Sequence, residues 1–293
     1  MSTTQRSNLI YPTVLQEEVV KGIAGMQIFG GSRAVVLNPS LQNGRNRVGA
    51  DVTVPYFDSI GKAQLIPDGG AVTPKRLAMS SESAVVIHLG DAVSINTLAG
   101  MATQGRDPYQ VARDMLLAGL AAKLEDIIVQ RLAARAVSAS MVYDGSSGNV
   151  SVAAINGTMQ KFGDELVKPA PALWFAKSNV MWDISALSDT LGRPLYVQNT
   201  SGIPSMLGPV PLVMSDKADL VLGTSPETYY TMLVKEGAVA VWMDPAVTIE
   251  EDRDSLADDD LLVMHAYMLV HAYGCMAGGT KAGVAAMKTR AST

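Results

Sequence analysis

The longest regular pattern in the sequence runs from Asp107 to Arg135 and reads DPYQVARDMLLAGLAAKLEDIIVQRLAAR. Asp107 is a favourable N-cap, and Pro108 suits the first position of a helix. Apolar side chains then recur at spacings of three and four residues, at Leu117, Leu120, Leu124, Ile127, Ile128 and Leu132. This spacing predicts one continuous helix from Pro108 to about Arg135. At 1.5 Å per residue its length is about 40 Å, enough to form the backbone of a subunit.

Two predicted strands precede this helix, at residues 52–57 and 84–89. Pro55 places the first strand at a sheet edge or against a bend. Residues 58–83 lie between the two strands, which is far more than the roughly two to five residues of an ordinary hairpin turn. We therefore expect this loop to project from the subunit and to become ordered against a partner.

Helical and strand patterns alternate after the long helix. The helical segments are expected at 155–167 and 178–187. Strands are expected at 173–176, 207–213, 220–223, 238–242, 247–250 and 261–273. The last two strands flank an acidic turn. The chain contains no internal repeat, and its fold class is predicted to be α+β.

Composition excludes several classes of protein. The chain has 293 residues, of which 48% are hydrophobic and 17% charged, so it is long and apolar enough to bury a sizeable core. Its net charge of -5 argues against tight binding to nucleic acid phosphates. The single cysteine, Cys275, rules out an intrachain disulfide and a cysteine-based zinc site. We expect no signal peptide and no membrane span.

Charge is distributed unevenly along the chain. Residues 1–50 contain five basic and two acidic side chains, and their Gly, Ser, Asn and Arg-rich part at 30–49 reads as an arm rather than a core element. Residues 244–260 contain eight acidic side chains and one arginine, and residues 261–293 contain three basic and no acidic ones. This distribution fits either pairing between copies of the chain or ordinary solvated loops.

The sequence contains no recognisable catalytic motif. A phosphate-binding loop, a dinucleotide fingerprint, a His-Glu-x-x-His motif and a Gly-x-Ser-x-Gly elbow are all absent from it. His265 and His271 are expected on one face of a strand, but about 20 Å apart, too far to share a metal ion. We therefore expect no enzyme activity and no catalytic residue, cofactor or metal ion.

The order of these parts resembles that of tailed-bacteriophage major capsid proteins of the Hong Kong 97 type. A basic arm, an oversized hairpin, a long helix, an α/β segment and two final strands around an acidic turn follow one another in both. The supporting local motifs stand at 52–56, 107–108, 192–196, 207–210 and 251–254. The resemblance spans nearly the whole chain.

The resemblance implies a division of the chain into six parts. Its elements would be an N-terminal arm, an E-loop hairpin, a long spine helix, and peripheral and axial domains. The corresponding ranges are 1–48 for the arm, 49–95 for the hairpin with its flanking peripheral strands, 96–168 for the peripheral domain with the spine helix, 169–243 for the axial domain, 244–273 for the return strands of the peripheral domain and 274–293 for the C-terminal tail. The tail would return to the axial domain or fray.

The implied function is structural. Many copies would assemble into hexamers and pentamers of an icosahedral phage head that encloses double-stranded DNA with weak, non-specific contact. Such a protein is located in the virion, is assembled in the cytoplasm of the host bacterium and works with scaffolding, portal and decoration proteins. Some members of this family join Lys to Asn between subunits. Residues 244–293 contain no Asn, so we expect a non-covalent shell that dissociates fully in a denaturing gel.

The expected contacts between subunits are charged side chains. Arg45 and Arg47 are candidates for pairing with the acidic turn at 250–260 of a neighbouring copy. The full set of candidates is Arg45, Arg47, Lys62, Asp68, Lys75, Arg76, Glu251, Asp252, Arg253 and Asp254.

Two alternatives to a phage head remain at this stage. One is a related cargo shell of the encapsulin type, which would hold a host enzyme rather than a genome. The other is an α+β enzyme or ligand-binding protein, which would be a monomer or dimer with a deep pocket.

Overall fold

The structure is a computed structural model. It describes residues 28–38, 41, 48–57, 63, 65–66, 74–76, 79–96, 108–188, 192–194, 196–198, 204–207, 209–216, 228–244, 248–254, 259–276 and 279–290.

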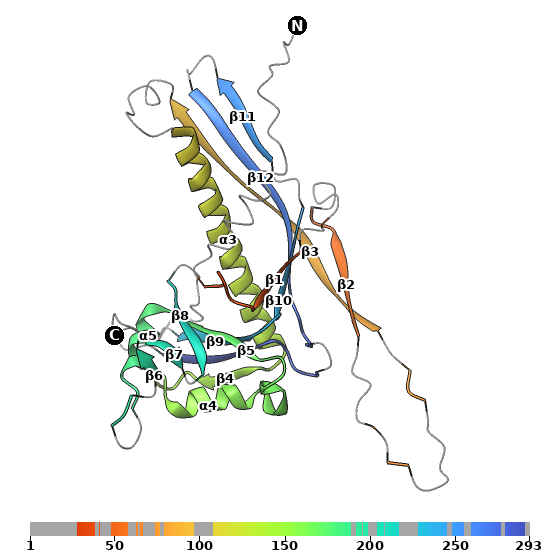
Figure 1. The fold of residues 1–293 in the computed structure, drawn as a ribbon, viewed down its shortest axis with the longest axis vertical. Helices are drawn as coiled ribbons and strands as arrows, with labels where there is room; N and C mark the ends of the chain where they lie inside the picture. Colours follow the sequence, from red (N-terminus) through yellow and green to blue (C-terminus); the bar gives the residue numbers. More distant parts are fainter. Residues whose placement is uncertain are drawn as a thin grey trace.

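The molecule is elongated, with two sheets joined by a long helix (Figure 1). Helix α3 (Pro108–Ser138) confirms the predicted helix and continues three residues beyond Arg135. One stripe of α3 is buried along most of its length, at Leu116, Leu120, Leu124, Ile128 and Leu132. Arg135 lies in the last turn, where its positive charge complements the helix dipole. In the described residues, no helix is long and apolar enough to cross a membrane.

In the described residues, the first sheet has six strands and lies against α3. Its order is β1 (Val35–Asn38), β10 (Val239–Met243), β12 (Asp259–Ala272), β3 (Met79–Asn96) and β2 (Asp51–Phe57), with β11 (Thr248–Asp254) also paired to β12. Alternate residues of β12 face the helix and are buried, namely Leu262, Met264, Ala266 and Met268. Their neighbours along the strand lie on the opposite face, which the helix does not cover.

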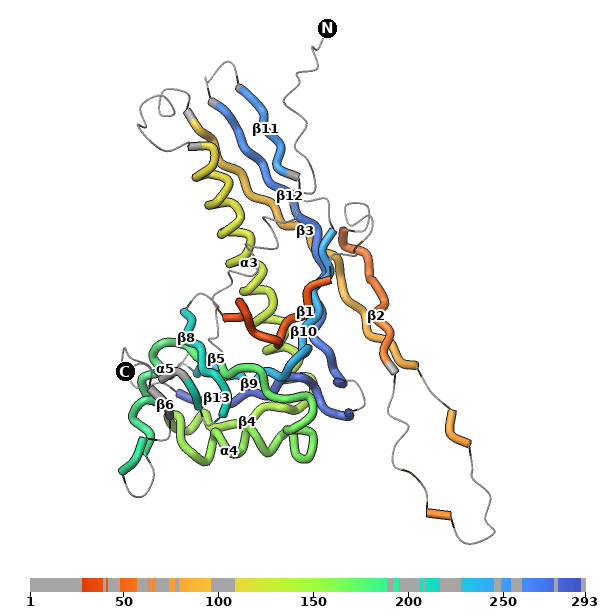
Figure 2. Tube along the Cα trace, in the orientation of Figure 1, coloured from red at the N-terminus to blue at the C-terminus, as the bar shows by residue number. Residues whose placement is uncertain are grey.

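Strand β3 is longer than the sequence predicted. It begins at Met79 rather than residue 84 and continues to Asn96, and its partner Phe57 lies opposite Met79. The connection between the paired strands is therefore residues 58–78. The first part of β3 is rich in serine and has no buried side chain before Ala84, so no hydrophobic alternation marked this part as a strand. The hairpin β2–β3 points away from the rest of the subunit (Figure 2).

The second sheet has seven strands within the part of the chain that the structure describes, and it forms the wider end of the molecule (Figure 1). Their order is β4 (Val142–Gly145), β13 (Val284–Arg290), β9 (Thr228–Lys235), β5 (Pro171–Ala176), β8 (Val210–Met214), β7 (Pro204–Leu207) and β6 (Tyr196–Gln198). The predicted strand at 173–176 is confirmed within β5. The predicted strand at 207–213 is instead two antiparallel strands, β7 and β8. The strand expected at 220–223 lies outside the described residues.

Two helices and a short 3-10 turn pack on this second unit. Helix α5 (Ser178–Ser185) confirms the prediction at 178–187. The helix expected at 155–167 is instead α4 (Val152–Gln160), followed by the 3-10 turn η3 (Gly163–Leu166). Ser151 caps α4 by accepting a hydrogen bond from the Ala154 amide at 3.2 Å. Gly163 has a φ of 55°, a left-handed conformation that ends the helical pattern.

Sheet pairing joins segments that the expected division of the chain places in different parts. The segment 28–38 was expected in an arm, but β1 pairs in parallel with β10, and Ile28 and Phe29 are buried in the main core. Strand β10 falls in the range 169–243 but belongs to the first sheet. Strand β4 falls in the range 96–168 but belongs to the second sheet. The C-terminal segment does not fray at β13, which lies between β4 and β9.

A core substitution in α3 tests whether this helix holds the subunit together. Leu124 is fully buried, so Leu124→Ala should lower the free energy of unfolding by about 2–5 kcal/mol. Met115 lies on the same helix and is 65% exposed, so Met115→Ala should change it by less than about 0.5 kcal/mol. Urea unfolding of the unassembled chain measures both. Equal effects of the two substitutions would contradict the packing described for α3.

Candidate subunit-contact site

The hairpin loop exposes large apolar side chains. Leu65 is 99% exposed and Ile66 is 43% exposed, and both lie between the two hairpin strands. Met79, at the start of β3, is also exposed. Burying a side chain of this size stabilises by about 1.5–3 kcal/mol. Because Leu65 is not buried in its own subunit, this stabilisation is still available for contact with another molecule.

The base of the hairpin is fixed by a charged cluster of Glu82, Arg135 and His271. Arg135 Nη2 donates to Glu82 Oε2 at 2.7 Å, and Arg135 Nε donates to the Ala272 carbonyl oxygen at 2.9 Å. His271 Nε2 lies 3.0 Å from the same Glu82 oxygen, a contact that is an ion pair only when the imidazole is protonated. The cluster thus joins β3, the end of α3 and β12 at the base of the hairpin.

The imidazole of His271 is buried, with 3% of its side chain exposed. Burial lowers its pKa below the ordinary value, the Glu82 carboxylate opposes this effect, and the positive charge of Arg135 adds to it. The folded protein therefore holds His271 in its neutral form more strongly than the unfolded chain does.

A second charged cluster ties the acidic strands to the start of α3. Arg113 pairs with Glu251, and the Tyr109 hydroxyl donates to Asp260. Arg253 lies 3.8 Å from Asp260. This end of the sheet is therefore held by contacts between β11, β12 and α3 within one chain.

The predicted contact residues fall into three groups. Lys75 and Arg76 are exposed, as are Asp252 and Arg253. Glu251 is engaged within the chain by Arg113. The remaining residues, Arg45, Arg47, Lys62 and Asp68 together with the side chain of Asp254, lie outside the described residues. The structure brings Glu251, Asp252 and Arg253 together on β11 but does not join Lys75 or Arg76 to them.

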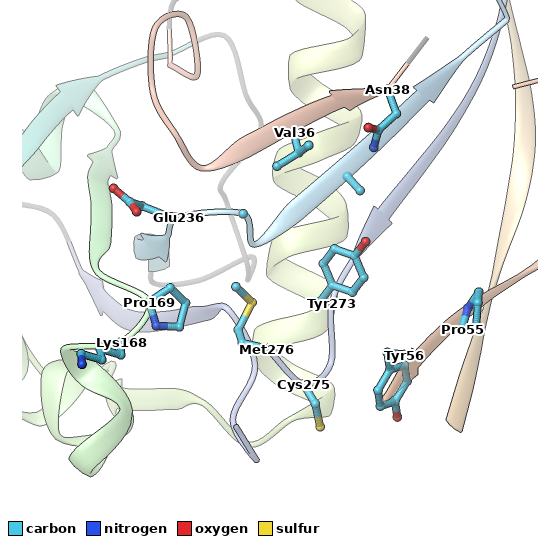
Figure 3. A pocket seen from close by; sticks show the side chains of 12 residues that line it. Val36, Asn38, Pro55, Tyr56, Lys168, Pro169, Glu236, Tyr273, Cys275 and Met276 are labelled. Carbon is cyan, nitrogen blue, oxygen red and sulfur yellow. The ribbon is translucent and has the colours of Figure 1, made fainter. Parts of the chain in front are cut away.

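An apolar groove lies beside the hairpin base, with a volume of about 720 Å³. Pro55 and Tyr56 of the hairpin line one side, and Pro169, Tyr273 and Met276 line the other (Figure 3). Its lining includes one carboxylate, which belongs to Glu236 and pairs with Arg33 at 3.5 Å. The groove is suited to covering apolar side chains rather than to acid-base chemistry.

Two residues have a burial that the sequence did not indicate: an exposed tryptophan and a buried lysine. Trp182 on α5 is 58% exposed, although its helix was predicted correctly. Lys235 is fully buried, where its ammonium group contacts the Glu165 carbonyl oxygen and lies 4.6 Å from the centre of the Phe162 ring. Burial lowers the pKa of Lys235, and the nearby Glu165 carboxylate opposes that shift. Neither residue has a local sequence signature, because both depend on what folds around them.

The two histidines of β12 make separate contacts, as expected. His265 Nδ1 lies 3.0 Å from His88 Nε2, while His271 contacts Glu82. In the described residues, no three His, Cys, Asp or Glu side chains are placed together to hold a metal ion.

Comparison with known proteins identifies the fold through structure and not through sequence. No protein-family model and no curated protein sequence matches the chain. In contrast, 184 chains of solved structures match it. A structure from Microbacterium phage Oxtober96 covers 99% of this chain and 96% of its own, with 12% identity and a TM-score of 0.63.

Two further structures show the breadth of the likeness. The capsid of Ralstonia phage GP4 matches with 10% identity and a TM-score of 0.62, covering 89% of this chain and 88% of its own. The SrpI encapsulin complex from Synechococcus elongatus matches with 10% identity and a TM-score of 0.57, covering 98% of this chain and 90% of its own. The α+β fold with its long helix and mixed sheets is therefore shared with these shells, and the resemblance of fold predicted from the sequence is confirmed.

The pH dependence of stability tests the charged cluster at the hairpin base. An unfolded histidine titrates near pH 6.5, and the folded pKa of His271 lies lower, so between these values the unfolded chain binds more protons. The stability that comes from burying His271 in its neutral form is therefore present above pH 6.5 and is lost as the pH falls below about 6.5 towards the folded pKa. His271→Gln should lose less free energy of unfolding than the original chain between about pH 7.5 and pH 5.5. Equal losses, measured by urea unfolding, would show that His271 does not contribute.

Proposed function

We propose that this chain is a major capsid protein that assembles into hexamers and pentamers of an icosahedral phage head enclosing double-stranded DNA. The observation that carries the proposal is the likeness in fold over 99% of this chain and 96% of a phage structure. The likeness to the GP4 capsid supports the same reading. Because one fold can serve several functions, the exposed surfaces must also suit assembly.

The parts of the fold can be given roles in such a shell. We assign the E-loop to the connection between β2 and β3, the spine to α3, the peripheral domain to the first sheet and the axial domain to the second sheet. This assignment moves β10 to the peripheral domain and moves β4, α4 and β13 to the axial domain. We assign the N-terminal arm to the residues before Ile28, since Ile28 and Phe29 already belong to the main core.

The exposed loop side chains supply the contacts for assembly. Leu65 contributes almost nothing to its own subunit, so its burial against a neighbouring copy adds to association alone. A subunit in a closed shell makes several such contacts at once, and many weak contacts then give a stable particle. Arg45 and Arg47 pair with Asp252 of a neighbour in this proposal, since Glu251 already has a partner within its own chain.

The charge of the chain suits a container for DNA. A net charge of -5 gives weak attraction to phosphates, so DNA can enter and leave without being held on the wall. The protein acts as a structural part of the virion rather than as an enzyme. Its partners are other copies of itself, with scaffolding, portal and decoration proteins as further partners during assembly in the host bacterium.

A cargo shell is the second candidate function, because the SrpI encapsulin complex matches over 98% of this chain. The two functions differ in the content of the particle. Purified particles that contain nuclease-protected DNA support the phage head, while particles that contain a host enzyme and no genome support the cargo shell.

A substitution in the loop tests the proposed function. Leu65→Asp places a charge where an apolar contact between copies is expected, so it should reduce the yield of shells or capsomer rings at least about tenfold. Because Leu65 is 99% exposed, the same change should leave the free energy of unfolding of the unassembled chain within about 0.5 kcal/mol. Sedimentation and negative-stain microscopy measure assembly, with neighbouring genes co-expressed where the chain alone does not assemble.

The matched control is Leu65→Met, which keeps an apolar side chain of similar volume and should assemble normally. Full assembly of Leu65→Asp would contradict the role of the loop. A small globular species from the unsubstituted chain under both expression conditions would contradict the shell function itself.

A further inference from the structure

Two histidine rings meet on the face of the first sheet that α3 leaves uncovered. His88 lies on β3 opposite Tyr267 of β12, and His265 lies on β12 opposite Gly90 of β3. The two histidines are therefore diagonal neighbours on one face. His88 Nε2 and His265 Nδ1 are 3.0 Å apart, and the ring centres are 5.1 Å apart.

The surroundings of the pair hold both rings in place. The His88 ring stacks on Tyr267 with a centre-to-centre distance of 4.7 Å and an angle of 14° between the planes. Gly90 provides the space that the His265 ring occupies, since a Cβ atom at Gly90 would lie 3.2 Å from His265 Nδ1. His88 is exposed and His265 is half-buried, so solvent reaches the pair.

The nitrogen separation matches one type of metal coordination. Imidazole nitrogens bind first-row divalent metals at about 2.0–2.1 Å, so two ligands at right angles stand about 2.9 Å apart. Two ligands of a tetrahedral ion would stand about 3.4 Å apart. The two nitrogens, now 3.0 Å apart in a hydrogen bond, are close to the separation of two ligands at right angles, as in the square-planar or tetragonal geometry of Cu²⁺ and Ni²⁺.

We propose that His88 and His265 form a two-histidine chelate for Cu²⁺ or Ni²⁺. The remaining coordination positions are filled by water, because the described residues supply no third His, Cys, Asp or Glu ligand. No metal site was predicted from the sequence, where only His265 and His271 lie near one another. The pairing register that brings His88 beside His265 is not visible in the sequence.

Binding replaces one contact of the pair by two. In the neutral pair, one of the two facing nitrogens carries a proton and donates a hydrogen bond, and the other accepts that hydrogen bond. Ligation needs both facing nitrogens free of protons, so the shared proton moves to the other nitrogen of its ring and no net proton is released. The ion then links β3 to β12 by two metal-nitrogen bonds, next to the hairpin that β3 helps to form.

Titration of the full chain, prepared without a histidine tag, with NiCl₂ in a calorimeter tests the proposal. The chain has only three histidines, so His271→Gln is a matched control outside the pair. The unsubstituted chain and His271→Gln should bind one ion per chain. His88→Gln and His265→Gln should each bind at least about tenfold more weakly, and circular dichroism checks that each variant is folded.

A second measurement needs no variant. The electron paramagnetic resonance spectrum of the unsubstituted chain with one equivalent of Cu²⁺ should show coupling to two imidazole nitrogens. Coupling to a single nitrogen, or a nickel affinity that is the same with and without His88, would overturn the proposal. So would the absence of nickel binding by the unsubstituted chain.

Discussion

The buried stripe of α3 is the contact on which the rest of the structure depends. Its leucine and isoleucine side chains pack against β12 and β3 of the first sheet and belong to the same core as residues of β5, β9 and β13 in the second. Glu125, buried on the same helix, accepts hydrogen bonds from the amides of Ile28 and Phe29 and so fixes the segment before β1. Helix α3 therefore packs against both sheets and also holds the segment that precedes β1.

With this frame fixed, the hairpin can extend without support of its own. The cluster of Glu82, Arg135 and His271 holds its base, and the exposed Leu65 lies in the connection beyond the paired strands. The core of this frame is built from apolar side chains, and the fold is shared with the GP4 capsid at 10% sequence identity. Many apolar sequences can fill the same core, provided that the pattern and volume are preserved.

The sequence was informative wherever a local pattern decided the structure. The spacing of Leu120, Leu124 and Ile128 predicted α3, and the alternation at 52–57 predicted β2. The start of β3 was missed because its serine-rich residues are not buried and carry no apolar period. The sheet that receives β10 could not be predicted, since strand pairing depends on contacts between residues far apart in the chain.

The candidate site was predicted less completely than the fold, for the same reason. Lys75 and Arg76 were predicted as contacts between subunits; both are exposed, and their contact with a neighbouring copy stays a prediction. The ion pair of Arg113 with Glu251 and the cluster around Glu82 join residues more than fifty positions apart, so no local motif marks them. The exposure of Leu65 also needs the structure, because a leucine in a loop is equally consistent with local burial.

A cryo-electron microscopy reconstruction of the particles formed by the full chain would decide whether the hairpin loop joins neighbouring subunits. We expect a closed icosahedral shell in which the subunit has α3 against the six-stranded sheet and the loop after β2 rests on a neighbouring copy, with Leu65 buried between them. Particles whose subunits meet without the loop, or a chain that stays monomeric or dimeric under every expression condition, would contradict this expectation.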